Sequence, residues 1–139
     1  MKIGVIGAGA VGVGICNYLL TLGSVSELIL LDRDVARAEG EVFDFRHTAA
    51  LTFSKNTRIV PTDDYLELIG ADIVVITAGA QIQQGQSRMD LAEINSKIGV
   101  DIAKKIERVA PKAVLIVVTN LVTLSRTALS PTPVTVRAG

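Results

Sequence analysis

The 139-residue sequence predicts an α/β fold, in which helices cover both faces of a doubly wound parallel sheet. Four short runs of Val, Ile and Leu indicate strands, because each run is nearly continuous, as is typical of parallel strands covered on both faces. Between the runs, apolar residues step by three and four, which indicates helices. The four runs are residues 3–6, 28–31, 73–76 and 114–118. Since a parallel crossover needs a helix to return the chain, we expect the strand order 3-2-1-4-5.

The remaining elements complete this alternation of strands and helices. A weaker strand fits residues 57–60 and is expected to stop at Pro61. Asp34 is a plausible N-cap for the second helix, and Pro111 follows the end of the longest one. Helices are expected over residues 11–22, 35–49 and 91–109.

Composition excludes several classes of protein. Apolar residues make up 49% of the chain, which is enough for a packed core, and the 14 basic and 14 acidic side chains balance to zero. Without a basic cluster, neither a nucleic acid nor an anionic membrane is an expected partner, and no apolar run approaches the roughly twenty residues of a membrane span. Cys16 is the one cysteine, so we expect no disulfide, no zinc site and a small buried side chain. A cytoplasmic domain without a metal is the expectation.

A glycine-rich turn lies between the first strand and the first helix. It has the pattern G-x-G-x-x-G, formed by Gly7, Gly9 and Gly12. In this context the first glycine permits a tight turn, the second lets the backbone approach a pyrophosphate, and the third allows close packing of helix and strand. The helix N-terminus then offers free N–H groups to the anion. The arrangement predicts a Rossmann-type dinucleotide site.

Asp32 ends the second strand about twenty residues after the last of these glycines, where a carboxylate accepts the ribose hydroxyls of an adenosine. The same carboxylate repels a 2′-phosphate, so NAD is expected rather than NADP. The neighbouring Arg33 keeps NADP open as the alternative. A helix-capping Asp beside a purely structural glycine turn is the other interpretation of these residues.

A polar segment follows the fourth strand. Residues 79–87 lack periodicity and lie at the carboxyl end of a parallel strand, where open α/β sheets bind their ligands. We expect a flexible loop that closes over a substrate. Arg88, at the far end of the loop, is a candidate electrophile for polarising a carbonyl group. A solvated arginine near a helix start is the alternative.

Several segments in register resemble the L-lactate/malate dehydrogenase family. They are the glycine turn, Leu31-Asp32, residues 71–75, residues 77–80, the pattern Gly85-x-x-Arg88-x-Asp90-Leu91, and Val118-Thr119-Asn120. Their order and spacing agree over residues 1–120, about the cofactor-binding half of that family's chain. The resemblance implies reduction of 2-oxo acids by NADH, and a homo-oligomer for the intact enzyme.

The resemblance also implies individual roles. Arg88 matches the arginine that polarises the substrate carbonyl, and Asn120 the asparagine that orients substrate and nicotinamide. Ile82 falls where lactate enzymes usually carry Gln and malate enzymes Arg, so we expect an apolar 2-oxo acid larger than pyruvate, such as a branched-chain one. His47 resembles a structural position. Cofactor contacts are implied for Gly7, Gly9, Val11, Gly12, Asp32, Arg37, Tyr65, Thr77, Gly79, Ala80, Val118 and Asn120.

Residues 121–139 break the pattern, since they contain no Asp, Glu or Lys and are rich in Thr, Ser and Pro. We therefore expect an NAD-binding domain over residues 1–120 and an atypical tail. The family's second domain, with its His–Asp pair and carboxylate-binding Arg, has no counterpart in the sequence. With suitable choices among the degenerate codons, reading one base out of register from Asn120 gives Asn-Pro-x-Asp-Ile-Ile-Thr-Tyr, the family's continuation.

A frameshift at Asn120 is accordingly one hypothesis for the tail, and it makes the chain a truncated dehydrogenase, inactive by itself. Loss of the following strand leaves the fifth strand as an apolar edge, which predicts association. A standalone NAD-binding module without catalysis and an inactive truncation product are the alternatives.

Overall fold

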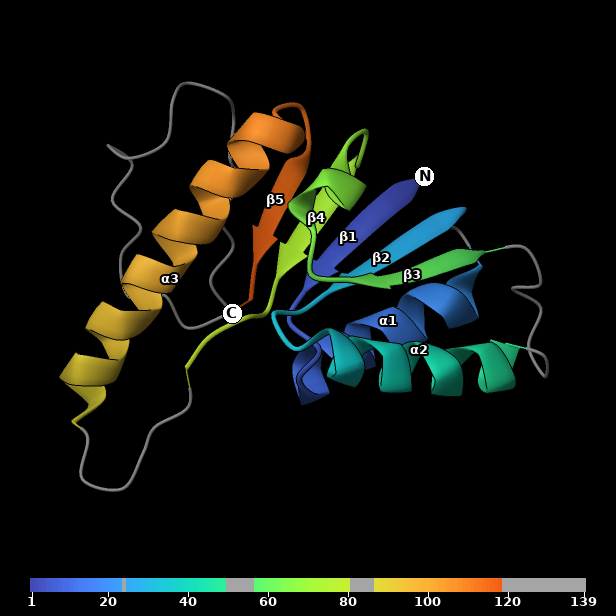
Figure 1. Cartoon of the computed structure of the whole chain (residues 1–139), viewed down its shortest axis with the longest axis horizontal. Helices are drawn as coiled ribbons and strands as arrows, with labels where there is room; N and C mark the ends of the chain where they lie inside the picture. The colour runs from blue at the N-terminus through green and yellow to red at the C-terminus, as the bar shows by residue number, and fades with distance from the viewer. Residues whose placement is uncertain (24, 50–56, 81–86, 119–139) are drawn as a thin grey trace.

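A computed structural model describes residues 1–23, 25–49, 57–80 and 87–118, except for the side chains of Ala49 and Arg88. The described chain forms one sheet with helices on both sides (Figure 1). In chain order the elements are β1 (Lys2–Ile6), α1 (Ala10–Leu22), β2 (Glu27–Leu31), α2 (Val35–Ala49), β3 (Arg58–Thr62), the short 3₁₀ helix η1 (Tyr65–Leu68), β4 (Ile73–Ile76), α3 (Arg88–Val109) and β5 (Val114–Val117).

The strand order is β3-β2-β1-β4-β5 and every pair is parallel, which confirms the predicted topology. The chain moves from β1 through β2 to β3 in one direction, and from β4 to β5 in the other. Because crossovers are right-handed, this reversal places α1 and α2 on one face and α3 with η1 on the other (Figure 1). Two apolar clusters form the core, one under α1 and α2 and one under α3.

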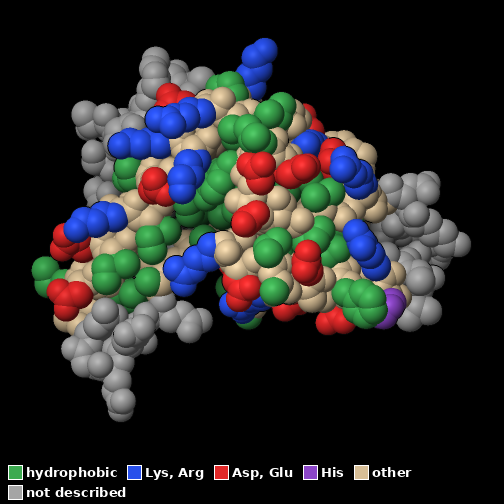
Figure 2. Space-filling model, viewed as in Figure 1, with side chains coloured by type: hydrophobic (Ala, Val, Ile, Leu, Met, Phe, Trp, Pro, Cys, Tyr) green, Lys and Arg blue, Asp and Glu red, His purple; other side chains and the backbone are tan. Residues whose placement is uncertain are grey.

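Charges of both signs are interspersed on the surface. Figure 2 shows Lys and Arg side chains beside Asp and Glu side chains over the viewed face, in keeping with a formal net charge of zero. Among the described residues, no helix combines the length and the apolar character needed to cross a bilayer.

Strand β3 continues past the point where the sequence predicts its end. The strand was expected to stop at Pro61, but it runs to Thr62, and Asp32 N donates to Thr62 O at 3.0 Å. Arg58 N donates to Ser26 O of the neighbouring chain segment, so alternate N–H groups of β3 point toward β2. Pro61 lies three residues after Arg58, so its backbone nitrogen faces away from β2, toward the outer edge of the sheet. The N–H that proline lacks would therefore not have bonded to β2. An edge strand tolerates proline at such a position.

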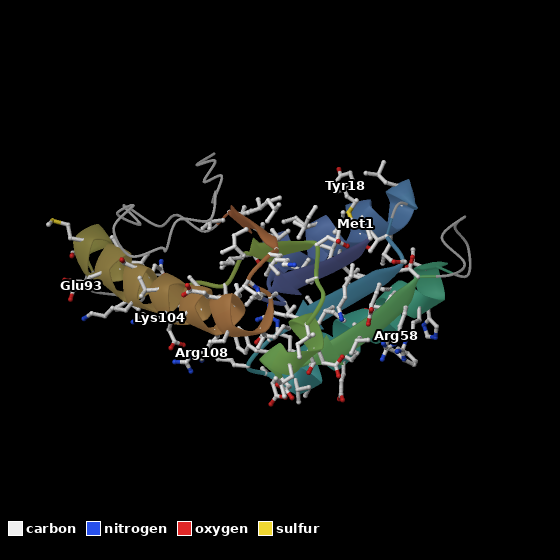
Figure 3. All side chains as sticks on the ribbon, turned by 90° about the horizontal axis from the view of Figure 1, so that it is seen from above. Met1, Tyr18, Arg58, Glu93, Lys104 and Arg108 are labelled. Carbon is white, nitrogen blue, oxygen red and sulfur yellow. The ribbon has the colours of Figure 1, made fainter. Side chains whose placement is uncertain are left out.

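Strand β5 is covered on one face only. The sequence predicts a strand buried on both faces, but Leu115 and Val117 are buried while Val114 is 47% and Ile116 38% exposed. Leu115 and Val117 pack with the cluster under α3. In the turned view, Tyr18 of α1 and Lys104 of α3 lie on opposite sides of the sheet (Figure 3). No helix in the described part of the chain covers the α1 side of β5, which explains the alternation.

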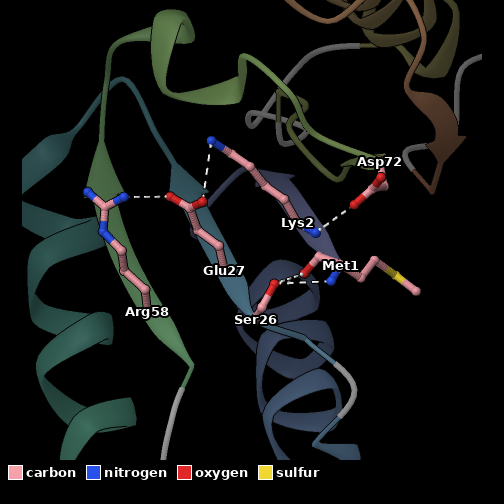
Figure 4. Close-up of polar contacts among 6 residues, drawn as sticks. All are labelled: Met1, Lys2, Ser26, Glu27, Arg58 and Asp72. Atoms are coloured by element: carbon pink, nitrogen blue, oxygen red, sulfur yellow. Dashed lines mark hydrogen bonds and ion pairs between the residues drawn. The ribbon is translucent and has the colours of Figure 1, made fainter.

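The amino ends of the strands are joined by a row of charges (Figure 4). Lys2, Glu27 and Arg58 are in register across β1, β2 and β3. Glu27 lies 2.8 Å from Arg58 Nη1 and 3.6 Å from Lys2 Nζ, while Lys2 N donates to Asp72 Oδ2 at 2.7 Å. The N-terminal amino group of Met1 donates to Ser26 Oγ at 3.0 Å. These contacts fix the register at the end of the sheet opposite the glycine turn.

Helix α3 begins three residues before its first predicted apolar position. Ser87 and Asp90 form a capping box, in which Ser87 Oγ accepts from Asp90 N at 3.1 Å and Asp90 Oδ2 accepts from Ser87 N at 3.2 Å. Both bonds satisfy N–H groups that a helix start otherwise leaves free. The predicted cap of α2 is confirmed, because Asp34 Oδ1 accepts from Arg37 N at 3.2 Å.

We predict that Ser87→Ala lowers the free energy of unfolding by about 1 kcal/mol, since the substitution removes the acceptor for Asp90 N. Urea unfolding followed by circular dichroism measures this change. Ser87→Thr keeps a hydroxyl at the same place and is expected to retain most of the stability. Equal stability of Ser87→Ala and the wild type would show that the capping box contributes nothing.

We also predict that Cys16 is unreactive in the folded chain. Its side chain is fully buried on the core-facing side of α1, as expected from the sequence, and burial raises the pKa of its thiol to about 12. Because the thiolate is the reactive form, the folded protein should not react with a disulfide reagent at pH 8, where the thiol is protonated. Absorbance of the released thiolate, with and without urea, measures this. Rapid stoichiometric reaction without urea would contradict the burial.

Candidate functional site

The carboxyl ends of β1, β2 and β4 meet at the glycine turn. Strands β2 and β4 flank β1, and the winding direction reverses between β1 and β4, the position where open α/β sheets form a ligand crevice. Gly7 N donates to Leu31 O at 2.8 Å on one side, and Thr77 N donates to Ile6 O at 2.9 Å on the other. The turn is therefore anchored between its two neighbouring strands.

The three glycines of the turn have different environments. Gly7 has φ +112°, and a Cβ there would lie 2.8 Å from Ala78 N and from Thr77 Oγ1. A Cβ at Gly12 would collide with the Gly7 carbonyl oxygen and lie 2.8 Å from Thr77 Oγ1. Around Gly9, a Cβ would meet no atom within 4 Å. Gly7 and Gly12 are thus required for close packing, whereas Gly9 leaves space above the turn.

The N-terminus of α1 opens toward this space. Gly9 is the N-cap, no side chain caps the helix, and no acidic residue lies in its first turn. The first hydrogen bond of the helix runs from Val13 N to Gly9 O at 2.9 Å, so the preceding N–H groups have no acceptor within the helix. Free amides at the positive end of a helix dipole form a binding site suited to a phosphate.

Asp32 holds its carboxylate beside the turn. Oδ2 accepts from Ala8 N at 2.6 Å, and Oδ1 accepts from Asp34 N at 3.0 Å. The side chain is half-buried at the end of β2. Because each carboxylate oxygen has two lone pairs, one acceptor position on each oxygen remains for a ligand. An oriented carboxylate with two such positions fits the two hydroxyls of a ribose, next to a helix terminus that fits a diphosphate.

The segment after β4 forms the other side of the crevice. Thr77 Oγ1 donates to Ile6 O at 3.0 Å and to Gly7 O at 3.1 Å. Three residues further on, Ala80 N donates to Asn95 Oδ1 at 2.6 Å, and Asn95 Nδ2 lies 3.5 Å from Ala80 O. Asn95 is buried in α3 with 5% of its surface exposed.

The sequence analysis does not predict a role for Asn95. Its position on the apolar side of the predicted helix, four residues after Leu91 and seven before Ile102, could have indicated a buried polar side chain. A polar residue among buried apolar ones needs a hydrogen-bond partner, and in this fold the partner is the backbone of Ala80.

Of the other described residues predicted to contact the cofactor, Val11 and Val118 lie beside the crevice, and the side chains of Arg37 and Tyr65 do not hydrogen-bond to the glycine turn. Val11 is 56% exposed at the start of α1, and Val118 N donates to Ile76 O at 3.0 Å beside β4. Arg37 is exposed in the first turn of α2. Tyr65 packs under α3 with Lys105 Nζ 5.2 Å from its ring centre, and burial raises the pKa of its phenol. Within the described chain, neither the Arg37 nor the Tyr65 side chain hydrogen-bonds to the glycine turn.

The predicted substrate-side residues are only partly placed. Arg88 is the first residue of α3, but its side chain is not described, and Ile82 and Asn120 lie outside the described residues. His47 is exposed on α2 with its ring 4.3 Å from that of Phe43, and it belongs to a surface pair rather than to the crevice.

Comparisons with known proteins agree with this geometry. The family model of the lactate/malate dehydrogenase NAD-binding domain matches residues 1–133. The L-lactate dehydrogenase of Deinococcus radiodurans is 44% identical over 124 residues, which are 89% of this chain and 40% of that protein. The malate dehydrogenase of Archaeoglobus fulgidus is 42% identical over 120 residues, 86% of this chain and 40% of that protein.

Solved structures show the same relationship. The NADH complex of the Archaeoglobus fulgidus malate dehydrogenase has a TM-score of 0.81 at 42% identity, over 86% of this chain and 40% of that one. The ligand-bound minor L-lactate dehydrogenase of Enterococcus mundtii has a TM-score of 0.80 at 30% identity, over 86% of this chain and 37% of that one. The chain thus spans about two fifths of the length of the relatives it matches. The resemblance predicted from the sequence is confirmed: this chain belongs to the lactate/malate dehydrogenase family and carries its NAD-binding domain.

Proposed function

We propose that this chain binds NAD with its diphosphate on the N-terminus of α1 and its adenosine ribose on Asp32, as the cofactor-binding part of an L-2-hydroxy-acid dehydrogenase. The observation that carries the proposal is the Asp32 carboxylate, held 2.6 Å from Ala8 N so that it faces the same turn as the helix terminus. One carboxylate and one helix N-terminus then recognise adjacent parts of a dinucleotide.

The same carboxylate supports a preference for NAD over NADP. A 2′-phosphate would bring a second anion against Asp32, whose Oδ1 and Oδ2 already accept from backbone groups that fix their position. Arg33, the one neighbouring cation considered from the sequence, is exposed and follows the end of β2. Among the ion pairs of the described residues there is none between Arg33 and Asp32, so the guanidinium is not held against the carboxylate where it would offset that repulsion.

The reaction of the intact protein is, in this proposal, reduction of a small 2-oxo acid. Bound NADH supplies the hydride that reduces the carbonyl carbon of such a substrate. The printed names of the relatives, L-lactate and malate dehydrogenase, support this class of substrate. Arg88, at the start of α3, is proposed to polarise the carbonyl and Asn120 to orient the substrate, while Ile82 favours an apolar side chain. A proton donor and a homo-oligomer are expected only in a protein with the relatives' remaining length.

We predict that Asp32→Ala weakens NADH binding about tenfold to a hundredfold, because two hydrogen bonds to a charged acceptor are lost. The affinity for NADPH should fall less, since the repulsion of the 2′-phosphate is lost as well. Fluorescence titration of the 139-residue chain measures both affinities. Asp63→Ala removes an exposed carboxylate just after β3 and serves as the matched control, with NADH affinity expected within about twofold of the wild type. Unchanged NADH affinity in Asp32→Ala would exclude the ribose contact.

A chimera tests the proposed reaction. Residues 1–120 of this chain are joined to the part of the Deinococcus radiodurans L-lactate dehydrogenase that follows the residue matched to Asn120. We expect the chimera to oxidise NADH with a branched-chain 2-oxo acid more efficiently than with oxaloacetate. Ile82→Arg should shift kcat/KM toward oxaloacetate by about tenfold or more, because an arginine can pair with a second carboxylate. Oxaloacetate as the best substrate before that substitution would contradict the role of Ile82.

The isolated 139-residue chain distinguishes the alternatives. NADH binding without turnover supports the cofactor-binding part of a dehydrogenase or a standalone NAD-binding module, and activity of the chimera favours the former. Absence of NADH binding, together with aggregation, favours an inactive truncation product.

A further inference from the structure

The four residues from Thr77 to Ala80, here called the 77–80 segment, are tied to the protein at both ends by side chains. At the first residue, Thr77 Oγ1 contacts the carbonyl oxygens of Ile6 and Gly7 at 3.0 and 3.1 Å. At the last residue, the Asn95 amide contacts both backbone groups of Ala80. One tie leads to the glycine turn and the other to α3.

We propose that Thr77 and Asn95 are positioning residues, which hold the 77–80 segment rigidly between the glycine turn and α3 and thereby determine how tightly the turn binds the cofactor. This inference deepens the proposed function and rests on it. It gives Thr77 a positioning role, whereas the family resemblance implies a direct cofactor contact.

The geometry around Thr77 explains why its hydroxyl is needed. A hydroxyl has one proton, so the contacts to Ile6 O and Gly7 O form one shared hydrogen bond. Thr77 Oγ1 fills the space left by Gly7 and Gly12, since a Cβ at either glycine would lie 2.8 Å from it. The hydroxyl therefore packs against both ends of the turn and is bonded to the Gly7 carbonyl oxygen.

The Asn95 side-chain amide faces both backbone groups of Ala80. Its oxygen accepts from Ala80 N and its nitrogen lies within reach of Ala80 O, so one side chain pairs with both groups of a single residue. Because Asn95 is buried, the loss of either partner leaves a polar group without solvent to replace it. Asn95 therefore links α3 to the 77–80 segment, and Thr77 links that segment to the glycine turn.

The Thr77 tie is tested with two variants of similar shape. Thr77→Val removes the hydroxyl and is expected to weaken NADH binding by the 139-residue chain about three- to tenfold, as for the loss of one hydrogen bond. Thr77→Ser restores the hydroxyl and should restore affinity. Hydrogen exchange without cofactor should be faster at the amides of Gly7 and Ala8 in Thr77→Val, while the amides of β2 are unchanged.

The Asn95 tie is tested in the same way. Asn95→Leu should release the Ala80 amide to faster exchange and weaken NADH binding about three- to tenfold. Asn95→Asp keeps an oxygen for Ala80 N but loses the donor that faces Ala80 O, so exchange at the Ala80 amide should be slower than in Asn95→Leu and faster than in the wild type. Ile106→Val, a buried substitution eleven residues further along α3, controls for a general loss of stability and should leave NADH affinity unchanged.

The outcomes separate the two hypotheses. Wild-type NADH affinity in either Thr77→Val or Asn95→Leu overturns the inference, because both ties are required. Equal weakening in Ile106→Val also overturns it, since affinity would then follow stability alone. If the wild-type chain binds no NADH, the proposed function is overturned, and exchange at Ala8 and Ala80 still decides whether the two side chains hold the segment.

Discussion

The structure depends on the close approach of the first strand's end to the first helix, which is possible only because Gly7 and Gly12 lack side chains. A Cβ at Gly12 would displace the Gly7 carbonyl, to which Thr77 is bonded. The same approach brings Ala8 N to the Asp32 carboxylate and leaves the first amides of α1 free. One steric constraint thus produces the anion-binding end of the helix and the orientation of the carboxylate beside it.

The two ends of the sheet are stabilised by different kinds of contact. At the amino ends, side chains of opposite charge pair across three strands and fix their register, with Glu27 between Lys2 and Arg58. At the carboxyl ends, backbone groups and short polar side chains anchor the turn and the segment after β4. Side chains of opposite charge are therefore paired at the end away from the crevice, while acceptors and amides that a dinucleotide needs remain available within it.

The burial of strand β5 differs from what its amino-acid pattern predicts. Its run of Val, Leu and Ile suits a strand covered twice, yet Val114 and Ile116 are exposed because the described helices cover only the other face. Association through this apolar edge, and a frameshift as the origin of residues 121–139, stay predictions. The family model matches through residue 133, beyond the domain boundary expected at residue 120.

The sequence by itself determined the strand order, the glycine turn and Asp32, because these follow from periodicity and spacing along the chain. It also indicated the family, through the resemblance of several segments in register. It also located Cys16 in the core and the cap of α2. The tertiary structure alone decided that Pro61 lies within β3, that β5 is open on one face, and that Asn95 supports Ala80. Each depends on which elements become neighbours. An edge position means that Pro61 needs no N–H for the sheet, and Val114 is exposed because none of the described helices covers its face. A contact across fifteen residues gives the buried Asn95 amide its partner.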